Sequence, residues 1–199
     1  MIEKIKELNQ LWEPVFPYLA QFAATFCSSY PERIAEMGPF CGVIYEFSKS
    51  NLGTELYILS FPEGMDEVYR DEVKQRGLKN IKIISTTFSL EGIQGEYFDF
   101  IFFRGAFFFP SIFEVDLLSI YRVLKRGGTA VIGGGFGKDT PPEIIESIKP
   151  KSKILNSQLK RINVSKDEVV SLIKKFGLNE NARVSEEGGI WIELKRSSP

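Results

Sequence analysis

Residues 97–135 read YFDFIFFRGAFFFPSIFEVDLLSIYRVLKRGGTAVIGGG, and this stretch gives the strongest indication of the fold. Its first part, 97–103, is an apolar run of the length of a buried strand. The amphipathic segment at about 111–124 predicts a helix that the glycine pair 127–128 stops, and 129–134 predicts a second strand. Strand, helix and strand in this order predict two parallel strands with a helix packed on the sheet.

The same alternation runs through the preceding part of the chain. Apolar runs of strand length alternate with amphipathic runs of helical length, which predicts a doubly wound, Rossmann-like α/β fold with both faces of the sheet covered. The expected strands are 33–37, 54–60 and 81–86, and the expected helices are 41–50 and 64–77.

The end of the chain breaks this alternation. The segment SKDEVVSLIKKFG (165–177) opens with a capping box, Ser165 followed by Glu168, and ends at a glycine, so it predicts a helix. The runs NARVS and GIWIELK that follow are separated by EEGG, which predicts a hairpin. We therefore expect a mixed sheet of seven strands with an antiparallel last strand.

The composition excludes several classes of function. Lys+Arg 25 balances Asp+Glu 26 without any block of like charge, which argues against a nucleic-acid footprint or a membrane patch. The N-terminus lacks the apolar core of a signal peptide, so we expect a cytoplasmic protein. The chain has no histidine and two cysteines, Cys27 and Cys41, so we expect no metal site and no His-dependent nucleophile.

Three segments resemble the class I S-adenosylmethionine-dependent methyltransferases. LLSIYRVLKRGGTAVIGGG (117–135) resembles the family's helix, Lys-x-Gly-Gly turn and fifth strand. YFDFIFFRGAFFF (97–109) is similar to its fourth strand, with Asp99 in the family's Phe-Asp pair, and RGLKNIKII (76–84) is typical of the approach to its third strand. The resemblance covers roughly residues 30–195 and implies S-adenosylmethionine as cofactor.

The resemblance also implies the cofactor site. RIAEMGPFCG (33–42) falls at the family's first motif, an acid followed by three spaced glycines, although Phe40 stands where the second glycine is expected. Ser60 stands where the family has its ribose-binding carboxylate, with Glu63 three residues later, and Thr87 stands where a carboxylate holds the adenine. Arg104 ends the fourth strand, next to the switch point where doubly wound sheets bind ligands. The predicted cofactor-binding residues are Glu36, Gly38, Phe40, Gly42, Ser60, Thr87, Phe88 and Arg104.

The first 30 residues have helical apolar spacing that is interrupted near Pro14 and Pro17. We expect an N-terminal helical cap at 1–30, packed over the cofactor end of a methyltransferase-like domain at 31–199, within one domain overall.

Two functions remain open at this stage. One is a methyltransferase that acts on a small molecule by in-line displacement, with no assigned catalytic residue and Glu36, Glu63 or a tyrosine as the candidate base. The other is a binding or interaction module that kept the fold without the chemistry, because Phe40, Ser60 and Thr87 all depart from the family pattern. The oligomeric state is not predicted.

Three aromatic or glycine-rich features also have two interpretations. The ring of Phe40 points either into the ligand pocket or into the interface between sheet and helix. The run 107–109 is either core or an aromatic wall for a planar substrate. The glycines of 133–137 allow either a close backbone approach to a ligand or a mobile lid.

Overall fold

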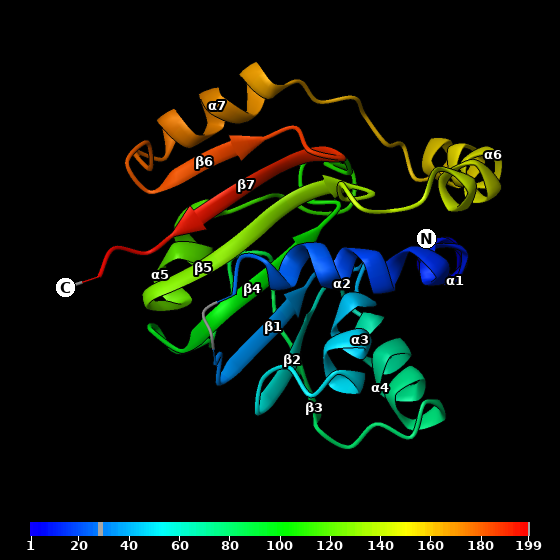
Figure 1. Cartoon of the computed structure of the whole chain (residues 1–199), viewed down its shortest axis with the longest axis horizontal. Helices are drawn as coiled ribbons and strands as arrows, with labels where there is room; N and C mark the ends of the chain where they lie inside the picture. Colours follow the sequence, from blue (N-terminus) through cyan, green and yellow to red (C-terminus); the bar gives the residue numbers. More distant parts are fainter. Residues whose placement is uncertain (28–29, 199) are drawn as a thin grey trace.

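The computed structural model describes residues 1–27 and 30–198 and contains one mixed sheet in the strand order β3-β2-β1-β4-β5-β7-β6 (Figure 1). β1 to β5 pair in parallel, and β7 alone runs in the opposite direction, between β5 and β6, which confirms the predicted mixed sheet with its antiparallel last strand. The strands are β1 Arg33–Met37, β2 Glu55–Ser60, β3 Ile81–Ser85, β4 Phe98–Arg104, β5 Leu124–Gly135, β6 Ala182–Ser185 and β7 Gly189–Lys195.

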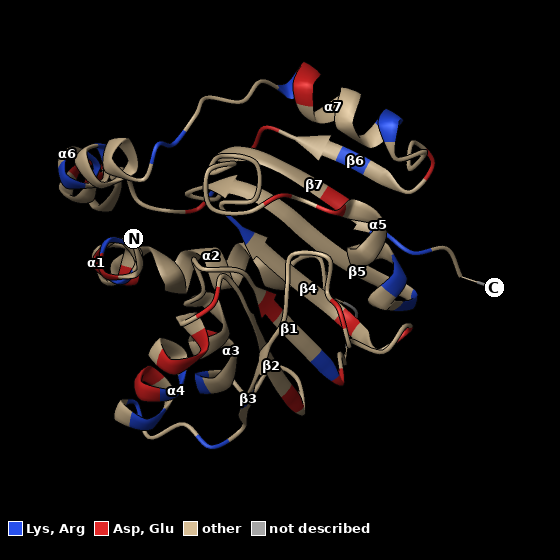
Figure 2. Ribbon diagram, turned by 180° about the vertical axis from the view of Figure 1, so that it is seen from behind, with Lys and Arg blue, Asp and Glu red and all other residues tan. Residues whose placement is uncertain are grey.

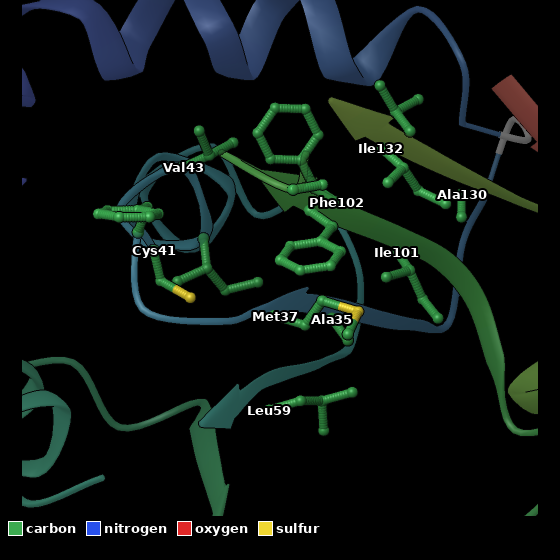
Figure 3. Close-up of a cluster of buried hydrophobic side chains, with 14 of the residues drawn as sticks. Ala35, Met37, Cys41, Val43, Leu59, Ile101, Phe102, Ala130 and Ile132 are labelled. Atoms are coloured by element: carbon green, nitrogen blue, oxygen red, sulfur yellow. The ribbon is translucent and has the colours of Figure 1, made fainter. Parts of the chain in front are cut away.

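The central strands are apolar because helices cover both of their faces. α2 and α3 lie against one face and α5 against the other, as a comparison of Figures 1 and 2 shows. Figure 3 shows buried side chains from β1, β2, β4 and β5 packed into one cluster. The helices are α1 Ile2–Trp12, η1 Glu13–Val15, α2 Phe16–Ala24, α3 Val43–Lys49, α4 Met65–Gln75, α5 Leu117–Val123, α6 Pro142–Gln158 and α7 Lys166–Lys175.

The helix after β4 is shorter than the sequence predicts. It begins at Leu117 because the side chain of Asp116 accepts a hydrogen bond from the backbone N–H of Ser119 and so caps the helix. It also ends at Val123, where β5 begins directly, so the predicted stop at 127–128 lies inside a strand. The remaining predicted elements are found within a few residues of their expected ends, including the capping box of α7.

The region of α6 has no helix or strand among those predicted from the sequence. Pro141 and Pro142 precede and open this helix, which buries Ile148 and Leu155 one heptad apart. The interior Pro150 weakens the helical pattern in the sequence, but the helix continues through it. α1 and α6 lie side by side beyond the carboxyl ends of β4 and β5 (Figure 1).

The N-terminal segment folds as an interrupted helix, as its prolines predict. α1 packs on the connections that follow β1 and β2, because the side chain of Asn9 donates to the carbonyl of Pro39 at 2.9 Å and Ile2 contacts Gly64. Ser28 and Ser29 of the predicted cap, and Pro199 of the predicted domain, lie outside the described residues. Across the described ranges, no helix has both the length and the apolarity needed to cross a bilayer.

Candidate functional site

The connection between β1 and α3 is organised around a buried carboxylate. Glu36 is 0 % exposed and accepts backbone hydrogen bonds from Gly42 at 2.8 Å, Ile44 at 2.8 Å and Val43 at 3.3 Å. Burial raises the pKa of Glu36 to about 7, although these amides and the charge of Arg104 act in the opposite direction. Because three donors occupy its oxygens, Glu36 holds the first turn of α3 in place and is poorly placed to remove a proton from a substrate.

Gly42 is required here for close packing. A Cβ atom at this position would overlap the ring of Phe16, so glycine lets α2 lie directly over the turn. Gly38, the other predicted glycine of the motif, accepts a hydrogen bond at 3.0 Å from the buried hydroxyl of Tyr69. That hydroxyl also accepts a hydrogen bond from the backbone N–H of Cys41 at 3.2 Å. Because Tyr69 belongs to α4, this helix holds the turn in place.

Phe40 is 1 % exposed and belongs to a group of five buried rings, which we call the aromatic cluster. Its ring centroid lies 4.5 Å from that of Phe109 and 6.4 Å from that of Phe113. Phe113 in turn contacts Phe61 at 5.6 Å and Phe103 at 5.5 Å. These residues come from the ends of β1, β2 and β4, so the cluster fills the space between those strand ends. Its members are Phe40, Phe61, Phe103, Phe109 and Phe113.

The other predicted residues of the adenosine half do not line the cavity that opens beside Arg104. Ser60 is buried at the end of β2, and its hydroxyl has no hydrogen-bond partner among residues 1–27 and 30–198. Thr87 is exposed and shares a hydrogen bond with Ser89 at 2.8 Å, Phe88 is half-buried, and Glu63 is exposed. Of these residues, Ser60 alone has a polar group that is both buried and unpaired.

Arg104 links the predicted motif to the N-terminal helix. Its guanidinium donates from Nε to the carbonyl of Phe40 at 3.0 Å and from Nη2 to the side chain of Asn9 at 3.1 Å. The guanidinium carbon lies 4.8 Å from the centroid of the Trp12 ring and 5.2 Å from that of Phe16. Burial lowers the pKa of Arg104 to about 10, against the raising effect of Glu36, so the group remains a cation at neutral pH.

A cavity of about 520 Å³ opens beside Arg104, at the carboxyl ends of β4 and β5 and between α1 and α6. Its volume lies within the range of about 300 to 1,000 Å³ that is usual for small-molecule sites. Phe108 and Phe109 form part of its wall, and Phe40 contributes one side of its ring. The aromatic-wall and core interpretations of 107–109 therefore both apply, because Phe108 and Phe109 are buried and also line the cavity.

The glycine-rich end of β5 forms another part of this wall. Gly134 and Gly135 line the cavity, and a Cβ atom on Gly134 would lie 2.7 Å from the ring of Phe108. Glycine at 134 therefore lets the aromatic wall lie against the strand.

Most of the polar wall comes from a region that the sequence analysis did not assign. Ser152 in α6 accepts hydrogen bonds from Trp12 Nε1 at 3.2 Å and from Asn156 at 3.3 Å, which joins α6 to α1. The signal in the sequence was an amphipathic stretch opened by two prolines. The α6 residues and those just after it that line the cavity are Lys149, Ser152, Lys153, Asn156, Ser157, Arg161 and Asn163.

Comparisons with known proteins agree with this architecture. No family model matches the sequence, and no curated protein matches it significantly. A candidate S-adenosylmethionine-dependent methyltransferase from Methanococcus maripaludis superposes with a TM-score of 0.77 at 22% identity, over 100% of this chain and 94% of that one. The chain has the class I methyltransferase fold.

Two further structures with this fold illustrate how far the sequences have diverged. A methyltransferase from Aquifex aeolicus has a TM-score of 0.63 at 20% identity, over 98% of this chain and 97% of that one. Geranyl diphosphate C-methyltransferase from Streptomyces coelicolor, in complex with its substrate and S-adenosylhomocysteine, has a TM-score of 0.58 at 9% identity, over 92% and 78%. At these identities, the likeness concerns the fold.

Proposed function

We propose that this protein is an S-adenosylmethionine-dependent methyltransferase whose substrate is a small molecule. The observation that carries the proposal is the cavity at the carboxyl ends of β4 and β5, beside the turn that follows β1. In doubly wound sheets, ligands bind at the carboxyl edge where the strand order reverses, which here lies between β1 and β4. The balanced charge of the chain supports a small molecule over a nucleic acid as the substrate.

Ser60 suits the ribose of the cofactor, whereas Phe40 occupies the place of its methionine part. The hydroxyl of Ser60 is buried without a partner at the strand end where the resemblance places the ribose, so it is available to a sugar hydroxyl. The ring of Phe40 packs on Phe109 at the place that the resemblance gives to the methionine part. Cofactor binding therefore requires the aromatic cluster to rearrange around Phe40.

Methyl transfer requires mainly that the protein position the acceptor and exclude water. When bound, S-adenosylmethionine supplies a methyl group on an electrophilic sulfonium. In this chain, Trp12, Phe108 and Phe136 wall off the cavity and would hold an apolar acceptor away from bulk water. Glu36 and Tyr69 are engaged with the backbone of the β1 turn, so neither is assigned as a general base.

A second candidate function is supported by the aromatic cluster itself. In this candidate, the five buried phenylalanine rings between the ends of β1, β2 and β4 keep the edge closed to the cofactor. The protein would then be a ligand-binding module that uses the cavity without methyl transfer.

Calorimetric titration with S-adenosylmethionine and S-adenosylhomocysteine separates the two functions. The methyltransferase proposal expects heat release with a dissociation constant in the micromolar range, and a loss of affinity in the Ser60→Ala variant. Silence at millimolar concentrations of both compounds would contradict it and favour the module. Thermal melting of each protein sample provides the control for folding.

A further inference from the structure

The cavity beside Arg104 has a one-sided charge. Among the described residues, four basic side chains line it and no acidic one does. Arg104 comes from the end of β4, whereas Lys149, Lys153 and Arg161 come from α6 and the segment after it, where Figure 2 shows basic residues. Of these three, Lys149 is paired with a carboxylate, Glu146 at 2.9 Å. The wall therefore presents a positive potential to whatever enters.

Arg104 is a buried cation, 5 % exposed, that has no carboxylate within ion-pair distance among the described residues 1–27 and 30–198. Its Nε and Nη2 atoms have protein acceptors, but Nη1 has none among those residues. The nearby Glu36 attracts it, but backbone amides already occupy that carboxylate. A buried guanidinium with an unused donor at a cavity wall is best satisfied by an anion that supplies both charge and acceptor.

The rest of the wall suits a flat apolar group. The rings of Trp12 and Phe136 are stacked, with centroids 4.7 Å apart and an interplanar angle of 4°. On another side, the guanidinium carbon of Arg161 lies over the ring of Phe108, 4.6 Å from its centroid. Trp12, Phe108 and Phe136 all line the cavity, so an apolar planar ligand there would contact aromatic side chains.

We propose that this cavity binds an anionic small molecule with a planar apolar body, in which a carboxylate or phosphate group meets Arg104 and the body lies among Trp12, Phe108 and Phe136. Arg161 and Lys153 attract the anion at the entrance. The proposal rests on the proposed function in that this molecule is the methyl acceptor, and it names the class of substrate. Binding of the anion itself does not require the cofactor.

The test is a calorimetric titration with matched probes that differ in charge. Naphthalene carboxylate, naphthyl phosphate and the neutral naphthalene carboxamide have the same planar body. We expect each anion to bind at least about tenfold more tightly than the carboxamide, because a hydrogen bond to a charged group is worth roughly one to two decades of affinity. Equal affinities for the anions and the carboxamide would overturn the proposal.

Variants locate the effect in the cavity. Arg104→Met should abolish the preference for the anions, and the Arg161→Gln and Lys153→Gln double variant should weaken it by about threefold to tenfold, with a stronger effect at low salt. The matched control is Lys151→Gln, which removes a lysine from the same helix that does not line the cavity. If Arg104→Met does not fold, as judged by its melting curve, the double variant decides the question, and an unchanged preference there would contradict the proposal.

A parallel titration with S-adenosylhomocysteine keeps the two proposals distinguishable. Anion preference without cofactor binding would leave the anion site standing and would contradict the methyltransferase. Cofactor binding without anion preference would do the opposite.

Discussion

Two halves of the same sheet edge use phenylalanine in opposite ways. Between the ends of β1, β2 and β4, the rings of Phe61, Phe103 and Phe113 contact one another and close the edge. At the ends of β4 and β5, Phe108 lines a cavity, and the guanidinium of Arg161 lies over its ring. The two halves differ in the elements that surround them. Beside β5, α6 and α1 line the cavity instead of filling it.

Truncation of one ring in each half is the strongest test of this contrast. Phe103 is fully buried, so Phe103→Ala should lower the free energy of unfolding by about 3 to 5 kcal/mol. Phe108→Ala should lower it by about half as much, since one side of this ring already borders the cavity and has fewer contacts to lose. Urea denaturation measures both, and equal losses would show that the two rings are packed alike.

The buried carboxylate of the closed half should make stability depend on pH. The pKa of Glu36 is raised from 4.5 to about 7 in the folded protein, so the folded state binds the proton more tightly than the unfolded state. Protonated Glu36 therefore contributes to the free energy of unfolding below pH 4.5, and this contribution is lost as the pH rises to 7. At about 1.36 kcal/mol per pKa unit, the free energy of unfolding falls by about 3 kcal/mol over this range.

The Glu36→Gln variant isolates this effect. Other carboxyl groups, such as Glu55 with its pKa lowered to about 2 by hydrogen bonds to Lys82 and Tyr57, contribute equally to both proteins. The difference in unfolding free energy between the variant and the wild type should grow in favour of the variant from pH 4.5 to 7. Parallel pH profiles would mean that Glu36 does not titrate in this window.

A smaller effect is expected at the unpaired hydroxyl of the closed half. An unsatisfied buried polar group costs about 1 to 3 kcal/mol, so Ser60→Ala should stabilise the free protein by about 1 to 2 kcal/mol. The same change should weaken binding of S-adenosylhomocysteine. A variant that is less stable than the wild type would indicate that Ser60 has a structural role.

The sequence predicts the sheet well because its signals are local. The apolar runs of the strands, the hairpin before β7 and the capping box at Ser165 depend on neighbouring residues alone. The predicted helix at about 111–124 begins too early, because the ring of Phe113 belongs to the aromatic cluster and α5 begins only at Leu117.

Local sequence patterns could not predict the cavity, because its walls come from distant parts of the chain. Arg104 was predicted near a ligand because it ends a central strand, and the structure places it at the cavity wall. Its partners Asn9 and Phe40 are far from it in sequence, as are Ser152 and Arg161 on the opposite wall. The two interpretations of Phe40 both hold in part, because its ring is buried among aromatic residues and also borders the cavity.

In the proposed methyltransferase, the closed half is a cofactor site held shut by its own rings. If so, the measured affinity is the intrinsic affinity reduced by the small population of the open state, and loss of the Phe40 ring raises that population. The most direct measurement is the dissociation constant of S-adenosylhomocysteine for the wild type and for Phe40→Ala, by calorimetry under the same conditions. We expect about tenfold tighter binding by the variant, which corresponds to about 1.4 kcal/mol, although its fold is less stable. Equal or weaker binding by a folded Phe40→Ala variant would contradict it.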